Sequence, residues 1–279
     1  MNWYNKKNTK NPYSPYKTFY SRSRQIKKII DKGIIGYFDI MGYQNFLTNN
    51  KIEDCINIIE EILIKIPDEI KNDYFNFNLK NDLERFINDY FHSHLNISFI
   101  SDTIIFFFDF ETIKKEELSV LLNQILFYLV IFTRLSFEKG FPMRGYIDYD
   151  SFYYNNDKNK NIIAGESIVN CHKETSKLNF SGLIIGDKLI NFCTELSDGY
   201  INQLFDRKLI KKYKVNTKNG EEYRHVANFI LGADHGDIVQ YVFESFHKHN
   251  KEINDEVMEK IKNTEKLIRH FVFNNKSQF

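Results

Sequence analysis

The hydrophobic positions along the first quarter of the chain predict a strand, a tight turn and a helix. Residues 33–40 form a short apolar run that is rich in β-branched and aromatic side chains, as a buried strand is. Met41, Gly42 and Tyr43 follow as a turn, and apolar residues then recur at helical spacing from Phe46 to Leu63. We therefore expect a β-strand at residues 33–40 that leads through a turn into a helix.

A hairpin and a long helix are predicted next. Residues 95–101 alternate apolar and polar side chains, residues 103–108 are continuously apolar, and Asp102 lies at the bend between them. Residues 114–139 then show helical spacing, which Gly140 and Pro142 end. Residues 125–132 are the longest apolar stretch, and they are too few to cross a bilayer.

The second half of the chain continues the alternation of strands and helices. We expect a strand over 142–149 that continues or restarts at 152–154, a hydrophilic hairpin loop over 155–161, a helix over 165–178 and a strand over 182–186. After Tyr200 a β-pair is expected at 209–215 and 223–231, with helices near 237–247 and 254–271.

This order of elements defines a fold class. Strand, helix, strand, strand, helix, strand is the split βαβ arrangement of ferredoxin-like sheets. We expect an α+β fold, a ferredoxin-like sheet flanked by helices, with the C-terminal β-pair and helices added. Residues 1–24, which are polar, are predicted to be a flexible arm, 25–200 to be the main domain, and 201–279 to be an extension packed on the same domain.

Composition and charge narrow the class of protein. The 279 residues are 42% hydrophobic and 27% charged, which is enough for a sizeable core. Lys and Arg number 38 against 37 Asp and Glu, so a protein built to bind nucleic-acid backbone is not expected, although a local basic pocket is compatible with this balance. Three scattered cysteines and a polar start argue against disulfides and a signal peptide. We expect a soluble cytoplasmic protein that binds neither membrane nor nucleic acid.

Two carboxylates carry the candidate chemistry. Asp39 ends the first strand and Asp102 lies at the hairpin bend, and in a split βαβ sheet these strands are neighbours, so the two can converge although 63 residues separate them. Facing carboxylates repel each other, and hard divalent cations relieve the repulsion. The turn at 40–43 offers backbone N–H groups to an anion. Together these features suggest phosphoryl or nucleotidyl transfer.

Each carboxylate also has a plain structural interpretation. An Asp at the end of a strand followed by Gly is common turn chemistry, which applies to Asp39, and Asp102 fits a hairpin turn equally well. Asp148 lies within a predicted strand and is interpreted as a solvated residue outside the site. The prediction of a metal site therefore depends on the conjunction of Asp39 and Asp102.

Four segments carry a resemblance to class III nucleotidyl cyclases. Residues 37–43 (YFDIMGY) resemble the Phe-x-Asp-Ile-x-Gly-Phe signature of that family, and residues 99–105 (FISDTII) resemble the hairpin with its second metal-binding aspartate. Residues 142–149 (PMRGYIDY) resemble the strand that follows, and residues 165–173 (GESIVNCHK) lie where the family has Gly-x-x-Val-Asn-x-Ala-x-Arg. All four occur in the family's order over roughly residues 33–190, which makes the resemblance specific.

The details resemble one branch of the family. Three features are similar to those of the pyrimidine cyclases of the bacterial Pycsar anti-phage system. They are Ser-Asp-Thr in the hairpin, Arg-Gly-x-Ile after the proline, and the C-terminal β-pair with helices. Purine cyclases carry an Asn and an Arg in the fourth motif, where this chain has Val169 and Lys173; a shifted alignment uses Asn170 but puts Glu174 at the Arg. Asp150 stands where a Gly is usual. The departure in the fourth motif lowers the expectation of an adenylate or guanylate cyclase.

The resemblance implies roles for particular residues. Two Mn²⁺ or Mg²⁺ ions would be held by Asp39, Asp102 and the backbone carbonyl of Ile40, and Arg144 would join the two aspartates as a catalytic residue in contact with phosphate. The residues implied in nucleotide binding are Phe38, Ile40, Gly42, Tyr43 and Lys173. For Arg144 a surface ion pair at a strand end is an equal alternative, and for Lys173 a solvated position on a helix surface is the favoured one. Tyr37 and Tyr43 fit either base stacking or the core.

The implied activity is the conversion of UTP or CTP to 3′,5′-cyclic UMP or cyclic CMP with release of pyrophosphate. The resemblance further implies a homodimer with active sites at the interface and a separate effector that reads the cyclic nucleotide during anti-phage defence. An adenylate or guanylate cyclase is one alternative, and a catalytically silent nucleotide-binding dimerisation module is another. The choice between UTP and CTP stays open.

Overall fold

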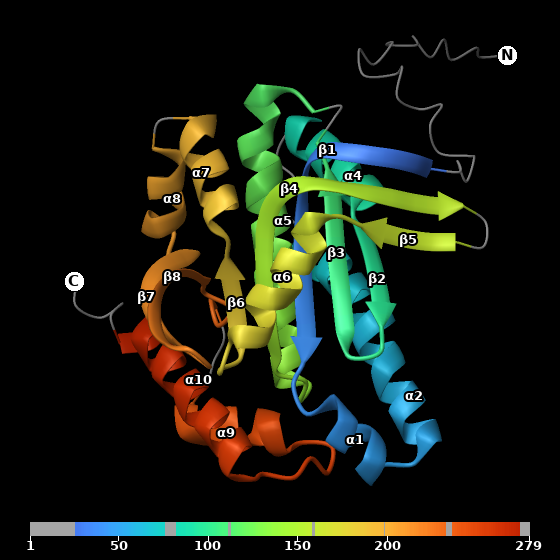
Figure 1. Ribbon diagram of the computed structural model, residues 1–279. Coiled ribbons are helices and arrows are strands. Elements are labelled where there is room, and N and C mark those ends of the chain that lie inside the picture. Colours follow the sequence, from blue (N-terminus) through green and yellow to red (C-terminus); the bar gives the residue numbers. More distant parts are fainter. Residues whose placement is uncertain are drawn as a thin grey trace, which may run out of the picture.

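The computed structural model describes residues 26–75, 82–110, 113–157, 160–197, 199–232 and 236–273. The N-terminal arm expected at residues 1–24 lies outside the described residues. One eight-stranded sheet runs through the described part with the order β2-β3-β1-β4-β6-β8-β7, and β5 pairs with β4 beside this path (Figure 1).

The first four strands form the predicted ferredoxin-like arrangement. They are β1 (Ile26–Ile40), β2 (Asn96–Ile100), β3 (Thr103–Asp109) and β4 (Met143–Asp157). β1 lies between β3 and β4 and is antiparallel to both, and β2 pairs with β3. The α+β, split βαβ prediction is confirmed. β-branched and aromatic residues dominate β1 and β3 because both faces of these strands are covered.

The crossover from β1 to β2 is longer and more irregular than the sequence indicated. It consists of α1 (Tyr43–Asn49), α2 (Ile52–Glu60), α3 (Ile66–Glu69) and α4 (Asp82–His94), with π-helical turns at Glu61–Lys65 and Ile70–Phe75. The single helix expected after the turn is interrupted at Asn50 and Lys51, between α1 and α2.

Helix α5 (Lys115–Glu138) connects β3 to β4 and forms the centre of one core. It ends as predicted, because Gly140 has a φ of 89°, a left-handed conformation that suits glycine. Residues Glu117–Glu138 are long and apolar enough to cross a membrane by length and composition alone, whereas the sequence interpretation counted only an uninterrupted run. Since 67% of that stretch is buried inside the protein, α5 is a core helix.

The remaining elements extend the same sheet. They are β5 (Lys160–Ala164), α6 (Glu166–Lys177), β6 (Gly182–Ile185), α7 (Asp187–Leu196), α8 (Tyr200–Asp206), β7 (Ile210–Thr217), β8 (Gly220–Ala227), α9 (Ile238–His247) and α10 (Asp255–Phe273). β6 is parallel to β4, and β8 pairs antiparallel with β6, so the predicted C-terminal β-pair continues the sheet. The polar loop expected over 155–161 is mostly strand, because β4 and β5 extend into it as a hairpin.

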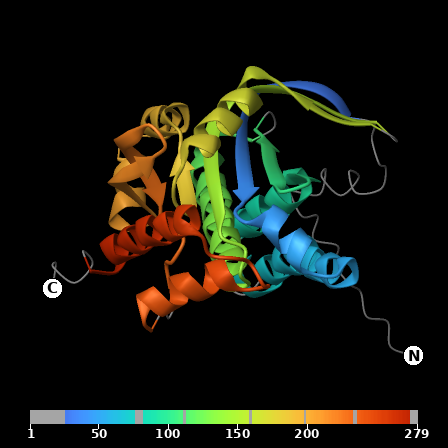
Figure 2. The ribbon, with the colours of Figure 1, turned by 60° about the horizontal axis from the view of Figure 1, so that its bottom comes forward.

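Two hydrophobic cores lie on the two faces of the sheet. One contains α4, α5 and α7, and the other contains residues of α6, α9 and α10. Successive residues of β1 alternate between them, so Phe38 enters the α5 core and Ile35 enters the α6 core. At the end of β1 this alternation directs Asp39 to the α6 face. The loop between α9 and α10 approaches α1 at one end of the molecule (Figure 2).

Candidate functional site

The ends of three strands meet at the candidate site. In the strand registers Asp39 lies opposite Thr103 of β3 on one side and opposite Arg144 of β4 on the other. The backbone N–H of Ile40 donates to the carbonyl of Asp102 at 2.8 Å. The structure therefore brings Asp39 and Asp102 to the same end of the sheet, as the predicted topology requires.

A two-residue turn places Asp102. Ile100 pairs with Thr103 across the β2–β3 hairpin, which leaves Ser101 and Asp102 as the turn. Ser101 has a φ of 58°, and two-residue hairpins need a positive φ at their first central position. Asp102 is half-buried, and within the described part of the chain its carboxylate has no hydrogen-bond donor. It is available for a cation.

Asp39 is held by an ion pair. The Nε of Arg144 donates to Oδ2 of Asp39 at 2.6 Å, and the two side chains are 18% and 20% exposed for Arg144 and Asp39. Burial raises the pKa of Asp39 above its ordinary value; Arg144 opposes this rise and the negative charge of Asp102 adds to it. Desolvation of the Asp39 carboxylate thus outweighs the attraction of its arginine partner.

This ion pair corrects one part of the sequence interpretation. Asp39 and Asp102 were expected to face each other without a basic partner, and Arg144 provides one because the β1–β4 register puts it directly opposite Asp39. The alternative for Arg144 was a surface ion pair at a strand end; the structure shows an ion pair there, but a mostly buried one. A second guanidinium nitrogen of Arg144 donates to the carbonyl of Leu178 at 3.4 Å. Contact with a phosphate stays a prediction.

Helix α6 covers the side of the strands that carries Asp39. The hydroxyl of Tyr37 and Oγ1 of Thr103 share a hydrogen bond of 3.1 Å, and the ring of Tyr37 meets His172 edge-on with centroids 5.4 Å apart. Thr175 donates to the carbonyl of Tyr37 at 3.4 Å. Burial raises the pKa of Tyr37, and both aspartates add to the rise. His172 and Thr103 thus belong to the surroundings of the site.

The sequence interpretation assigned neither His172 nor Thr103 a role. His172 lies next to Lys173 in the fourth motif, and Thr103 follows Asp102, so their positions inside two matched segments were the available signal.

The predicted nucleotide-binding residues divide into buried and exposed groups. The side chains of Phe38 and Ile40 are 0% and 3% exposed, and that of Tyr43 is 8% exposed and packs on Phe46. These three side chains are in the core and do not reach a ligand. Gly42 and Lys173 are exposed, the latter on the surface of α6. The core alternative for Tyr43 is the one the structure shows.

Asp148 is not the solvated residue that the sequence suggested. It is half-buried, and it accepts hydrogen bonds from the backbone N–H groups of Tyr149 at 2.9 Å and Leu189 at 2.8 Å. It therefore caps the first turn of α7, and burial raises its pKa. Asp150, which stands where the family usually has Gly, pairs with Lys188 at 2.5 Å. Asp148 and Asp150 are residues of β4, and both contact the first turn of α7.

The donor set suits a hard divalent cation. Among the described residues no group of three or more His, Cys, Asp and Glu side chains is placed to hold a metal. The available ligands are the two carboxylates and the backbone carbonyl of Ile40, all oxygen, which Mg²⁺ and Mn²⁺ accept together with substrate oxygens. Burial raises the pKa of Asp39 and the nearby charge of Asp102 adds to the rise, and a cation between the two carboxylates would oppose both effects. The residues present therefore fit the implied ions.

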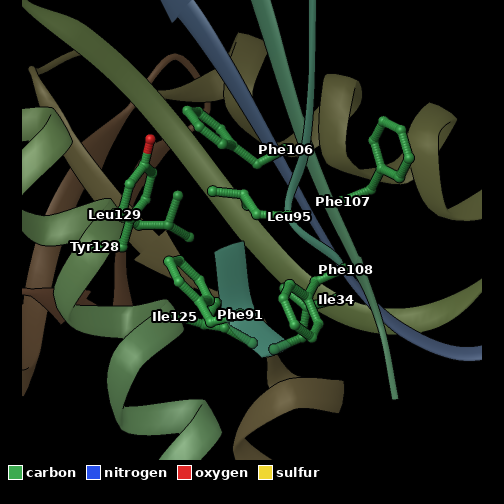
Figure 3. Close-up of a pocket in the computed structure, with 9 residues that line it drawn as sticks. All are labelled: Ile34, Phe91, Leu95, Phe106, Phe107, Phe108, Ile125, Tyr128 and Leu129. Atoms are coloured by element: carbon green, nitrogen blue, oxygen red, sulfur yellow. The ribbon is translucent and has the colours of Figure 1, made fainter. Parts of the chain in front are cut away.

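An apolar pocket of about 10 Å³ lies on the other face of the sheet (Figure 3). It is lined by side chains of α4, α5 and the strands, among them Phe91, Phe106 and Ile125. A space of this size holds at most a single water molecule, and an apolar lining gives that water no partners. It is a packing gap, separate from the aspartates.

No protein-family model and no curated protein matches this chain. Among solved structures, it is similar to the dimeric guanylyl cyclase domain of the RhoGC fusion protein from the aquatic fungus Blastocladiella emersonii, with a TM-score of 0.46, 9% identity and coverage of 72% of this chain and 97% of that one. It is also similar to the adenylyl cyclase CyaB from P. aeruginosa, with a TM-score of 0.41, 12% identity and coverage of 72% and 94%. These structural neighbours are nucleotidyl cyclase domains.

Proposed function

We propose that this protein is a nucleotidyl cyclase that converts a pyrimidine ribonucleoside triphosphate, UTP or CTP, to the 3′,5′-cyclic monophosphate and pyrophosphate. The observation that carries the proposal is the meeting of Asp39 and Asp102 at one end of the sheet, linked by the hydrogen bond from Ile40 to Asp102. The four motif segments that resemble class III cyclases supply the reaction type, because these two residues are the aspartates of the first two segments.

The reaction forms one phosphate ester bond and breaks one anhydride bond. The ribose 3′-oxygen bonds to the α-phosphorus, the bond between that phosphorus and the bridging oxygen breaks, pyrophosphate leaves, and the hydroxyl proton passes to solvent. Asp39, Asp102 and the Ile40 carbonyl would hold two Mn²⁺ or Mg²⁺ ions, which supply Lewis acidity toward the 3′-hydroxyl and the phosphates. Arg144 lies beside Asp39, and its planar guanidinium suits the spread charge of a phosphate.

The exposed turn at Gly42 is the proposed contact of the β- and γ-phosphates. Gly42 is exposed with a φ of 78°, and the N–H groups of Ile40 and Met41 are already bonded to Asp102 and Pro142, so the N–H groups of Gly42 and Tyr43 are the proposed donors. Lys173 is exposed on α6 and is the proposed second positive charge. The remaining work of the protein is placement and charge stabilisation, which dominate this kind of chemistry.

The pyrimidine assignment depends on the fourth motif. Val169 and Lys173 stand where purine cyclases carry Asn and Arg, and both are exposed on α6. A purine cyclase is the nearest alternative by fold and motif. A silent nucleotide-binding module is a second candidate, because Arg144 already pairs with Asp39 and would compete with a cation for that carboxylate.

The assembly and cellular role follow from the same resemblance. The proposed enzyme is a cytoplasmic homodimer whose active sites lie at the interface, and its product activates a separate effector in anti-phage defence. Sedimentation of the purified chain tests the first part, since a monomer with full activity at nanomolar concentration contradicts shared sites.

Incubation with each of the four ribonucleoside triphosphates tests the activity. Purified protein with Mn²⁺ is expected to release pyrophosphate and a cyclic nucleotide, identified by mass spectrometry, from UTP or CTP. Asp39→Asn and Asp102→Asn are expected to abolish the product, while Asp206→Asn, an exposed aspartate of α8, retains it. Cyclic product from ATP or GTP only overturns the pyrimidine assignment. Product from none of the four supports the silent module.

A further inference from the structure

The segment between α9 and α10 packs against α1 and against the turn that follows Asp39. This segment, residues 248–252, is called the connector here. Figures 1 and 2 both show the connector beside α1. A hydrogen bond between Asn50 and Asn250, which are 200 residues apart in sequence, confirms this proximity. The connector therefore links the C-terminal helices to the candidate site.

Lys251 is the central residue of the connector. It is only 3% exposed, and its Nζ donates to the carbonyl of Gly140 at 2.5 Å and to that of Ser245 at 3.2 Å. The ring of Phe141 lies 5.4 Å from the same nitrogen. Among the described residues no carboxylate forms an ion pair with Lys251. Removing an ammonium group from water costs free energy when its only partners are carbonyl groups and a ring. The buried position of Lys251 therefore depends on the specific contacts that it makes there.

The charged groups around Lys251 do not compensate its charge. Lys248 lies near enough to disfavour the ammonium form, and burial and Lys248 together lower the pKa of Lys251 to about 7. His249 is half-buried with Nε2 2.6 Å from the carbonyl of Lys139. On the α5 side Lys139 pairs with Glu61 at 2.8 Å, so that carboxylate is already engaged. Tyr43 is the titratable group of α1, and burial raises its pKa.

The aliphatic part of Lys251 lies on the turn after β1. A Cβ atom built on Gly42 would be 3.2 Å from Cδ of Lys251, so the lysine stem contacts the turn backbone. Gly42 precedes α1 directly, and its φ of 78° is left-handed. Lys251 thus joins three segments: the β1–α1 turn, the α5–β4 loop and the end of α9.

Asparagines complete the attachment of the connector to α1. The side chain of Asn45 accepts from the backbone N–H of Glu252 at 2.6 Å, and that of Asn50 donates to the carbonyl of His249 at 2.8 Å. His249 and Asn250 have φ values of 64° and 56°, a left-handed conformation that non-glycine residues adopt rarely and at a cost. Tertiary contacts are needed to hold two such residues in succession.

On its other side the same turn is joined to the metal ligands. The N–H of Met41 donates to the carbonyl of Pro142 at 2.9 Å, and that of Ile40 donates to Asp102. We propose that the connector fixes the β1–α1 turn and that Lys251 is a positioning residue for the Asp39, Ile40 and Asp102 ligand set. This proposal rests on the proposed function for what the ligands bind, but the mechanical link can be measured without it.

Hydrogen exchange of the full chain measures the link. Lys251→Met keeps the stem that contacts Gly42 and removes the bonds to Gly140 and Ser245. The amides of residues 41–49 are expected to exchange about tenfold faster in this variant, while α4 on the far side of the crossover is unchanged. Lys262→Met, at an exposed position of α10, is the matched control and is expected to behave as the wild type.

Mn²⁺ binding then separates positioning from simple support. With Mn²⁺ alone as the probe, the dissociation constant is expected to rise at least about threefold in Lys251→Met, equal to a loss of about 0.6 kcal/mol, and not in Lys262→Met. Asn50→Ala, which removes the side-chain hydrogen bonds to Phe46, His249 and Asn250, is a second variant and is expected to change both readouts in the same direction.

Unchanged exchange of residues 41–49 in both Lys251→Met and Asn50→Ala overturns the proposal. Faster exchange with unaltered Mn²⁺ affinity also overturns it, because Lys251 would then support the fold without positioning the ligands. If the wild-type chain bound no Mn²⁺ and cyclised no triphosphate, the proposed function would fail, and the exchange rates alone would still decide whether the connector holds the turn.

Discussion

The pair of Asp39 and Arg144 determines the electrostatics of the site at the scale of single residues. Both side chains are mostly buried, and their contact of 2.6 Å is a charge-assisted hydrogen bond. The pKa of Asp39 is nevertheless raised, since desolvation outweighs the attraction of one arginine. A divalent cation and Arg144 therefore both act on the same carboxylate.

Replacement of Arg144 separates its competition with the metal ion for Asp39 from its proposed contact with a phosphate. In Arg144→Gln a positive charge beside Asp39 is lost, so Mn²⁺ binding at pH 8 is expected to tighten by about tenfold, about 1.4 kcal/mol for charges a few ångströms apart in a partly buried site. Cyclisation is expected to slow, because the guanidinium no longer meets a phosphate. Titration with Mn²⁺ followed by electron paramagnetic resonance checks the first effect, and weaker Mn²⁺ binding would contradict the competition.

The raised pKa of Asp39 predicts the acid limit of metal binding. A proton and a cation compete for the carboxylate, so Mn²⁺ affinity falls as pH falls through the pKa of Asp39, which lies above the ordinary value of 3.8. Measurement of the Mn²⁺ dissociation constant from pH 4 to pH 8 in wild type gives the midpoint. A midpoint at or below the ordinary aspartate value contradicts the geometry of a desolvated Asp39.

The sequence predicted which residues meet at the site but not how they pair. Asp39 and Asp102 follow from strand order, because alternation along β1 and a two-residue turn fix their places. The pairing of Arg144 with Asp39 depends on the register between β1 and β4, which no local pattern encodes. The burial of Lys251 was also beyond sequence reasoning, since a lysine in a polar segment normally indicates solvent.

At the scale of elements, periodicity located the strands and helices that pack against the cores. β2, β3, α5, α6 and the β7–β8 pair lie within a few residues of their predicted positions because each has one clear hydrophobic pattern. The π-helical turns around Pro67 were not predicted, and neither was the extension of β4 beyond Tyr154 into the expected polar loop. The π-helical turns arise because Pro67 disturbs the helical register locally. β4 continues through polar residues because β1 and β5 pair with it on both sides.

The connector element predicts a pH dependence of stability. The pKa of Lys251 is lowered from 10.5 to about 7, so the unfolded chain binds more protons than the folded one between these values, and stability rises with pH in that range. From pH 7 to pH 9 this group is expected to add about 2 kcal/mol to the free energy of unfolding. Urea denaturation of wild type and Lys251→Met at both pH values isolates it, and an equal pH slope in the two proteins contradicts the burial of a titrating lysine.

For the whole molecule, a single sheet with a core on each face joins the N-terminal and C-terminal halves. β8 pairs with β6, and α10 buries Leu267, Ile268 and Phe271 against the α6 face of the sheet. The connector adds a second link, from α9 and α10 to α1. The C-terminal segment is thus part of the structure that presents the aspartates, and its removal affects more than its own residues.

Truncation before Asp255 tests this unity. Loss of α10 exposes the apolar surface under Leu267, Ile268 and Phe271, and each such side chain contributes roughly 1.5–3 kcal/mol by burial. Their sum approaches the whole stability of an ordinary domain, about 5–15 kcal/mol. The truncated chain is therefore expected to lose its cooperative thermal transition and near-ultraviolet circular dichroism. Lys262→Met with Lys266→Met, two exposed changes on the same helix, is expected to keep both signals. A truncated chain that melts cooperatively near the wild-type temperature contradicts a shared core and makes α10 a separable addition.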